Sequence, residues 1–180
     1  MDFRKIASAF APVAAIGMSA VLSGCHGAEV AINGEAGKPL SELDLSGPPP
    51  HSLVLLGPDS VQIQPGDKLA IKVEGDPAQA DHLRFTLKDG TLGVLRDKKG
   101  WENTGGPISV LVTMPAPKAL TMTGSGRITS AALARDADIT IAGSGDLDTP
   151  RVDGDKLDIT IGGSGTYRGA GHVADLGVNI

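Results

Sequence analysis

Residues 138–145 read Asp138-Ile139-Thr140-Ile141-Ala142-Gly143-Ser144-Gly145, a run of alternating polar and apolar residues that ends in Gly-Ser-Gly. Residues 120–126 and 157–165 repeat this pattern. The serines of the three Gly-Ser-Gly tripeptides are at positions 125, 144 and 164, so the pattern returns after 19 and then 20 residues. A fixed repeat of this length is typical of a chain that stacks copies of one small structural unit.

Each repeat predicts a short β-strand and a sharp corner. Side chains alternate between the two faces of a strand, so Ile139 and Ile141 are expected to face a core while Asp138 and Thr140 face outward. Glycine adopts a positive φ without steric penalty, which allows the chain to turn sharply after each strand. The predicted corner residues are Gly124, Ser125, Gly126, Gly143, Ser144, Gly145, Gly163, Ser164 and Gly165. The repeats therefore indicate an all-β solenoid with coils of about 20 residues.

The composition agrees with a chain of many short strands. The 180 residues include 25 glycines and 12 prolines, and only 3% of the residues are aromatic. A hydrophobic content of 41% still supports a packed core. The formal net charge of −5 lacks the basic character of nucleic-acid-binding domains, so a nucleic-acid partner is not expected. Upstream of the repeats, residues 85–92 alternate around Asp89-Gly90, which predicts a β-hairpin.

Residues 1–24 are predicted to be a lipoprotein signal peptide. Charged residues precede an apolar run of 17 residues that ends at Leu22, whereas a membrane-spanning helix needs about 20. The run leads into Leu22-Ser23-Gly24-Cys25, which resembles the bacterial lipobox. That resemblance implies cleavage before Cys25, followed by acylation of its thiol and of its new amino group. Cys25 is the only cysteine, so it is the predicted lipidation site. The alternatives are an ordinary signal peptide followed by a chance cysteine, or a lone buried thiol.

Removal of residues 1–24 leaves 14 basic and 20 acidic residues, a net charge of −6. His26 stands where an aspartate would mark retention in the inner membrane, so the lipobox resemblance implies the outer membrane. Residues 25–51 contain three consecutive prolines and little periodicity, which predicts a tether, with an edge strand near Leu43 and Leu45 as the alternative. Residues 52–180 are predicted to form the folded domain.

An ordered set of segments resembles the "putative auto-transporter adhesin, head GIN domain" family of bacterial envelope proteins. The segments are residues 61–67, 71–76, 88–92 and 110–115, followed by the Gly-Ser-Gly repeats. The resemblance covers about residues 52–180. It implies a right-handed parallel β-helix-like fold and a secreted or surface-tethered location. It implies no catalytic residue and no cofactor.

The chain departs from the family pattern at its last residues. Residues 176–180 lie 19 positions after residues 157–161, in register with that strand. The family pattern would continue into another Gly-Ser-Gly and a closing segment. We therefore expect the sequence to be truncated here; the alternative is that a partner covers the open end, because an uncapped solenoid exposes strand edges and core.

The repeated serines are weak candidates for a catalytic nucleophile. A nucleophile elbow has the form G-x-S-x-G, and the stretch around Ser164 departs from it at Thr166. The four histidines (26, 51, 82 and 172) are scattered, and catalysis needs one serine rather than three. We predict no catalytic residue. A carbohydrate-active β-helix enzyme, a polysaccharide lyase or hydrolase, is the alternative, although no long loop that would build a cleft follows Gly126.

Aspartates concentrate in the repeats and raise the question of calcium. They are Asp136, Asp138, Asp146, Asp148, Asp153, Asp155 and Asp158. Calcium prefers oxygen ligands, but the calcium β-roll uses nine-residue repeats of the form G-G-x-G-x-D, about half the length of the repeat in this chain. The aspartates are therefore predicted to be solvated, and no metal is expected. Carbohydrate stacking is limited to Phe85, Trp101 and Tyr167 in the mature chain, and Trp101 is predicted to cover the end of a core.

Together these observations predict a lipid-anchored protein of the bacterial cell envelope with a non-catalytic adhesion, binding or structural role. Membrane lipid is the expected partner of acylated Cys25. An envelope protein, a surface polysaccharide and self-association through the C-terminal coil are left open as further partners. No cofactor is expected. The predicted location is the outer membrane, on its periplasmic or surface side.

Overall fold

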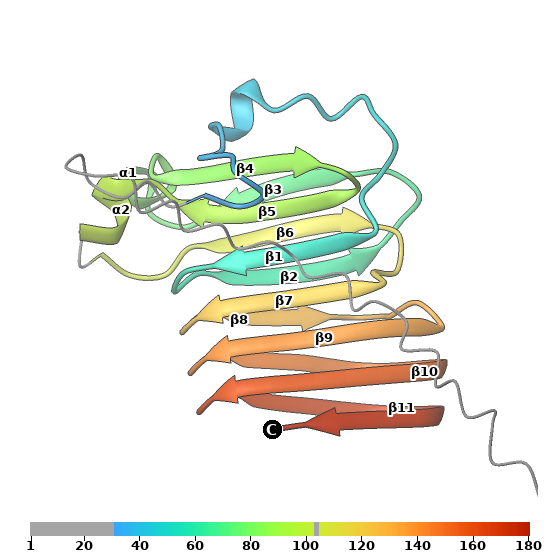
Figure 1. Ribbon diagram of the computed structural model, residues 1–180. Helices are drawn as coiled ribbons and strands as arrows, with labels where there is room; N and C mark the ends of the chain where they lie inside the picture. The colour runs from blue at the N-terminus through green and yellow to red at the C-terminus, as the bar shows by residue number, and fades with distance from the viewer. Residues whose placement is uncertain (1–30, 103–104) are drawn as a thin grey trace, which may run out of the picture.

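The computed structural model describes residues 31–102 and 105–180 (Figure 1). The predicted signal peptide, residues 1–24, and the predicted lipidation site, Cys25, lie outside the described residues. The prediction of an all-β fold is confirmed. The strands are β1 (Ser52–Leu56), β2 (Ser60–Pro65), β3 (Ala70–Glu74), β4 (Leu83–Lys88), β5 (Thr91–Arg96), β6 (Ser109–Met114), β7 (Ala119–Gly124), β8 (Arg127–Ser130), β9 (Asp136–Gly143), β10 (Asp146–Gly163) and β11 (Thr166–Asn179). The helical elements are η1 (Leu40–Glu42), α1 (Pro77–Ala80) and α2 (Lys98–Glu102).

All the strands belong to one sheet of eleven strands that curls into two layers. The strand order is β3-β6-β2-β8-β10-β9-β7-β1-β5-β4, and β11 pairs with β10. The sheet curls at β10, because the first residues of this long strand pair with β8 and its last residues pair with β9. Figure 1 shows the two layers of strands from the side. The buried apolar side chains form the core between them.

The repeats pair in parallel and in the register that the serine spacing predicts. Leu120 pairs with Ile139, Ile139 with Ile159, and Ile159 with Val178. Ile139 and Ile141 are buried, whereas Asp138, between the buried Ala137 and Ile139, is exposed. Equivalent side chains therefore stack in columns along the sheet, which is the favourable arrangement for parallel strands of like sequence.

The first half of the domain does not stack in the order of the chain. β1 lies between β5 and β7, so two later strands sandwich the first one. The antiparallel strands β3 and β4 close this end of the sheet by pairing with β6 and β5. The hairpin predicted at Asp89-Gly90 is confirmed: both residues have positive φ (49° and 71°), and Lys88 pairs with Thr91.

Part of the segment predicted as a tether packs on the sheet. Ile32 is 5% exposed and contacts Val54 and Leu95, and Leu40 and Leu43 pack against the main core. The backbone of Lys38 pairs with that of Phe85 in β4. These contacts could not be predicted from the sequence. Isolated apolar side chains that pack on an already formed sheet do not recur at a regular spacing along the chain.

Within residues 31–102 and 105–180, no helix is long and apolar enough to cross a membrane.

Candidate functional site

The three Gly-Ser-Gly tripeptides lie side by side at the ends of β7, β9 and β10, where the chain turns from one layer to the other. Their first glycines, Gly124, Gly143 and Gly163, have φ values of 113°, 127° and 118°. L-residues with a side chain rarely adopt this conformation. Their serines, Ser125, Ser144 and Ser164, are exposed.

The tripeptides contact one another along the stack. The Ser144 N–H donates to the Gly124 carbonyl (2.9 Å), and the Asp146 N–H donates to the Gly126 carbonyl (3.0 Å). A Cβ atom on Gly143 would lie 2.4 Å from the Gly124 oxygen, and one on Gly145 would lie 2.4 Å from the Gly126 oxygen. Backbone atoms fill the space beside both glycines, so a side chain there would push two coils apart.

Residues 57–59, Gly-Pro-Asp, occupy the equivalent place in the coil of β1 and β2. Gly57 has a φ of 138°, and the Arg127 N–H donates to the Asp59 carbonyl (3.0 Å). Asp59 thus stands where the later coils have a glycine. Its side chain is accommodated because the next coil, formed by β5 and β6, connects its strands through α2 and a longer loop.

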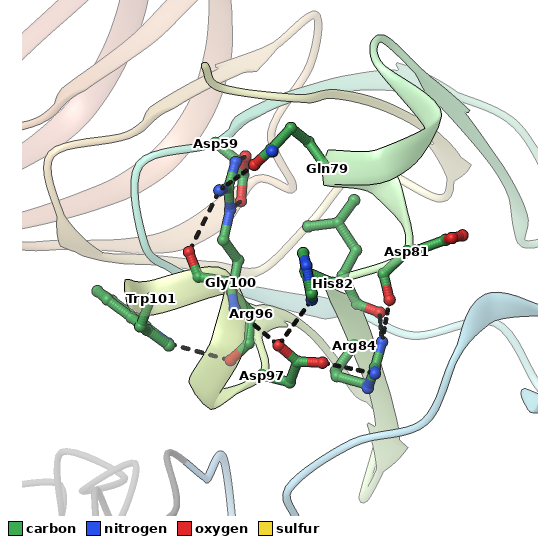
Figure 2. Close-up of polar contacts among 10 residues, drawn as sticks. Asp59, Gln79, Asp81, His82, Arg84, Arg96, Asp97, Gly100 and Trp101 are labelled. Carbon is green, nitrogen blue, oxygen red and sulfur yellow. Dashed lines mark hydrogen bonds and ion pairs between the residues drawn. The ribbon is translucent and has the colours of Figure 1, made fainter. Parts of the chain in front are cut away.

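The Asp59 carboxylate is fully buried and forms an ion pair with Arg96 (Figure 2). The Arg96 Nε donates to Oδ2 (2.9 Å) and its Nη2 donates to Oδ1 (2.6 Å). The backbone N–H of Ile108 also donates to Oδ1 (2.8 Å), while Arg96 donates to the Gly106 carbonyl (3.0 Å). The hydrogen bonds that Arg96 donates to Asp59, together with the charge of that carboxylate, outweigh burial and raise the pKa of Arg96, so the guanidinium stays charged.

A second, half-buried cluster surrounds Asp97 beside this pair (Figure 2). Its carboxylate accepts hydrogen bonds from the Gly100 N–H (2.8 Å) and from Arg84 Nη2 (2.6 Å), and it lies 3.1 Å from His82 Nδ1. Burial opposes ionisation of Asp97, but the Gly100 N–H, His82 and Arg84 outweigh it and lower the pKa of the carboxyl group.

Asp97 is expected to stabilise the fold at neutral pH and to lose this effect in acid. Its pKa is lower in the folded chain than in the unfolded chain, where a value of about 3.9 is usual. Its contribution is therefore complete above about pH 4 and disappears as the pH falls through the folded pKa. In urea unfolding, Asp97→Asn should lower stability at neutral pH and flatten the decline toward acid. An unchanged acid slope would contradict this prediction.

Trp101 lies at the end of the row of corners. Its indole N–H donates to the Arg96 carbonyl (3.0 Å), and the ring lies beside Gly57, 3.8 Å from the position that a Cβ would take. The side chain is 42% exposed. It covers the corner of β1 and β2 and presents an aromatic edge to solvent at the same time.

Three of the aspartates considered for calcium, Asp146, Asp148 and Asp155, form ion pairs with arginines, and Asp158 pairs with Lys156. Arg127 binds both Asp146 and Asp148, and Arg168 reaches the same two carboxylates at 3.5 and 3.4 Å. Arg135 binds Asp155 through two hydrogen bonds of 2.8 and 2.6 Å. In the described part of the chain, no three histidine, cysteine or acidic side chains gather where they would hold a metal ion.

The sequence did not reveal the Asp59–Arg96 pair or the Asp97 cluster. Asp59 and Arg96 are 37 positions apart, and neither belongs to a recognisable motif. One signal was present: Gly57-Pro58-Asp59 begins with a glycine after a strand, as the Gly-Ser-Gly tripeptides do. In the described residues, every buried side-chain nitrogen or oxygen has a hydrogen-bond partner. The buried Asp59–Arg96 pair is therefore a closed network, and the two clusters together attach α1 and α2 to the end of β5.

Comparison with solved structures gives the fold a relative. A crystal structure of a protein from Parabacteroides distasonis, described as a putative lipid binding protein, superposes with a TM-score of 0.60 at 22% sequence identity. The alignment covers 73% of this chain and 58% of that one, so this chain spans little more than half of its relative.

A putative adhesin from Bacteroides fragilis matches 73% of this chain and 93% of its own, with 12% identity and a TM-score of 0.46. No curated protein matches the sequence. The sequence itself matches the family model described as "Putative auto-transporter adhesin, head GIN domain" over residues 49–180, and because this match includes most of its length, the chain belongs to that family.

Proposed function

We propose that this protein is a lipid-anchored component of the bacterial cell envelope that binds through its stacked β-sheet and catalyses no reaction. Membership of an adhesin-type family supports a role at the cell envelope. The ion pairs of the buried and half-buried aspartates support the non-catalytic part of the proposal. The buried and half-buried carboxylates of Asp59 and Asp97 are neutralised by arginines, so they serve the architecture. The outward faces of the strands then provide the surface for contact.

The anchor in this proposal is Cys25, acylated after removal of residues 1–24. The position of the only cysteine, directly after Leu22-Ser23-Gly24, supports it. Two or three acyl chains hold a protein stably on a membrane, whereas a single chain holds it only marginally. The outer membrane is the proposed location, since His26 replaces the aspartate that marks retention in the inner membrane.

The proposed binding surface is built from equivalent positions of successive coils. We interpret the repeats as turns of a right-handed parallel β-helix, an interpretation that the parallel ladders of β7, β9, β10 and β11 support. Such a stack offers long rows of like side chains. An envelope protein or a surface polysaccharide would meet these rows, and a second copy would meet β11, where Leu176 and Val178 are each 56% exposed.

Replacement of Cys25 by serine should abolish lipidation. The serine hydroxyl lacks the thiol that accepts the first acyl group, so the variant should incorporate no palmitate analogue and should leave the membrane fraction. Metabolic labelling and fractionation measure both effects. Ser23→Ala is the matched control, because it preserves a small residue before the cysteine and should be labelled normally. Labelling of the Cys25→Ser protein would contradict the proposed anchor.

The partner is identified by cross-linking in the native envelope. Cells that express the lipidated protein are treated with a short cross-linker, and the products are compared with those of the Cys25→Ser protein. A product that requires the lipidated form supports a membrane-bound binding role. Steady conversion of an acidic polysaccharide by the purified domain would instead overturn the non-catalytic part of the proposal.

A further inference from the structure

The segment before β1 contains a structured strap, which we define as residues 32–43. It begins with a tight turn in which the Ile32 N–H donates to the Glu35 carbonyl and the Glu35 N–H donates to the Ile32 carbonyl, both at 3.0 Å. Asn33 and Gly34 in this turn have positive φ values of 52° and 78°, as a two-residue hairpin turn requires. The strap therefore has its own local structure.

Ile32 fits a recess on the outer face of the sheet. The floor of the recess is Gly93 of β5: a Cβ there would lie 2.9 Å from Cδ1 of Ile32. Val54 and Leu95 pack against the same side chain and are 4% and 0% exposed. A Cβ at position 93 would lie closer still, at 2.3 Å, to the Thr86 hydroxyl oxygen, so glycine there leaves room for both Thr86 and Ile32.

The strap also extends the sheet at the free edge of β4. The Lys38 N–H donates to the Phe85 carbonyl (2.9 Å), and the Phe85 N–H donates to the Lys38 carbonyl (2.8 Å). Lys88 at the end of β4 pairs with Glu35 at 3.4 Å. Leu40 and Leu43 then pack against the main core. Three kinds of contact therefore hold the strap: an apolar side chain in a recess, a backbone pair and an ion pair.

We infer that the strap shortens the lipid anchor and holds the domain against the bilayer, with the outer face of β1 and β5 nearest the membrane. This inference rests on the proposed acylation of Cys25. Cys25 and Ile32 are seven positions apart, so the chain between them spans at most about 25 Å. A tether that ran freely to Ser52 would span up to about 90 Å. The domain is thus confined to contacts close to the membrane surface.

The strap also determines which face points away from the bilayer. Val54 lies beneath the strap and pairs with Thr121, which pairs with Thr140, which in turn pairs with Thr160. Residues that pair across neighbouring strands point to the same face of a sheet, so these four positions share the membrane-facing side. Gln62 lies on the exposed outer face of the opposite layer, between the buried Val61 and Ile63. The opposite layer is therefore the face available to a partner that approaches from outside the membrane surface.

Energy transfer to the membrane tests this arrangement in the full-length, lipidated protein. A single cysteine introduced at Thr160 or Gln62 receives a donor dye, since acylation blocks Cys25. The protein is placed in phosphatidylcholine vesicles that contain a trace of headgroup-labelled acceptor lipid. We expect stronger transfer from Thr160→Cys than from Gln62→Cys. Adding Ile32→Asp should reduce transfer about twofold, because the first attachment then moves to Lys38 and the reach grows to about 45 Å.

The matched control is Ser41→Asp, which adds the same charge to an exposed position of the strap and should leave transfer unchanged. Equal transfer with and without Ile32→Asp, or stronger transfer from position 62 than from position 160, would overturn the inference. A protein that does not float with vesicles refutes the proposed lipidation instead. In that event hydrogen exchange of the Glu35 and Lys38 amides still tests the strap: both should be protected, and Ile32→Asp should remove the protection of Glu35 while that of Lys38 remains.

Discussion

Replacement of Asp59 by alanine is expected to destabilise the fold by about 3–5 kcal/mol, because it leaves the guanidinium of Arg96 buried without its counter-charge. Arg96 is 1% exposed and cannot turn out to water without unpacking α1 and α2. The Ile108 N–H loses its acceptor in the same variant. Urea unfolding followed by circular dichroism measures the loss.

Two controls separate the buried charge from ion pairing in general. Asp148→Ala removes a surface carboxylate that pairs with Arg127, and it should cost less than about 1 kcal/mol because solvent screens such pairs. The double variant Asp59→Leu/Arg96→Met should recover much of the stability, since it removes both charges while retaining bulk. A loss below about 1 kcal/mol for Asp59→Ala would show that water reaches Arg96 and would contradict the closed network.

Replacement of Gly143 by valine is expected to destabilise the fold by a similar amount, about 3–5 kcal/mol, through strain and steric overlap. Its φ of 127° disfavours a β-branched residue, and the added Cβ would lie 2.4 Å from the Gly124 carbonyl oxygen. That oxygen accepts the Ser144 N–H, so relief of the overlap would break a hydrogen bond between coils. The urea midpoint should fall sharply.

The neighbouring repeat supplies the matched control. Gly162→Ala places a Cβ 3.9 Å from the Ile141 oxygen, an ordinary contact, and should change stability by no more than about 0.5 kcal/mol. Ser144→Ala should be similarly mild, because this serine is exposed at the corner. If Gly143→Val and Gly162→Ala had equal effects, the close approach of successive coils would not explain the glycine requirement.

The repeats were predictable because their information is local and periodic. Ile139 and Ile159 lie 20 positions apart in the sequence and pair directly in the sheet. The hairpin at Asp89-Gly90 was predictable for the same reason, since two residues determine the geometry of the turn. Each of these predictions depends on neighbours along the chain or on an exact repeat of the same residues.

The position of β1 was not predictable from such patterns. Leu53 pairs with both Leu92 and Leu120, residues 39 and 67 positions away, and many apolar strands of this chain would satisfy the same alternation. Only the assembled sheet, in which β1 has a partner strand on each side, selects one pairing among these alternatives. The same holds for Asp59 and Arg96, whose carboxylate and guanidinium meet because the coil of β5 and β6 opens into a loop at that corner.

The sequence by itself determined the strand type, the repeat length and the register of the later coils, and it is the basis of the proposal that Cys25 is acylated. Only the tertiary structure decided the order of the first coils, the buried ion pair and the docking of Ile32 on Gly93. The physical reason is the range of the interactions. The alternation of side chains and the glycine turns depend on a few neighbouring residues and are present in each repeat. The buried ion pair and the recess for Ile32 form only after distant strands have packed together.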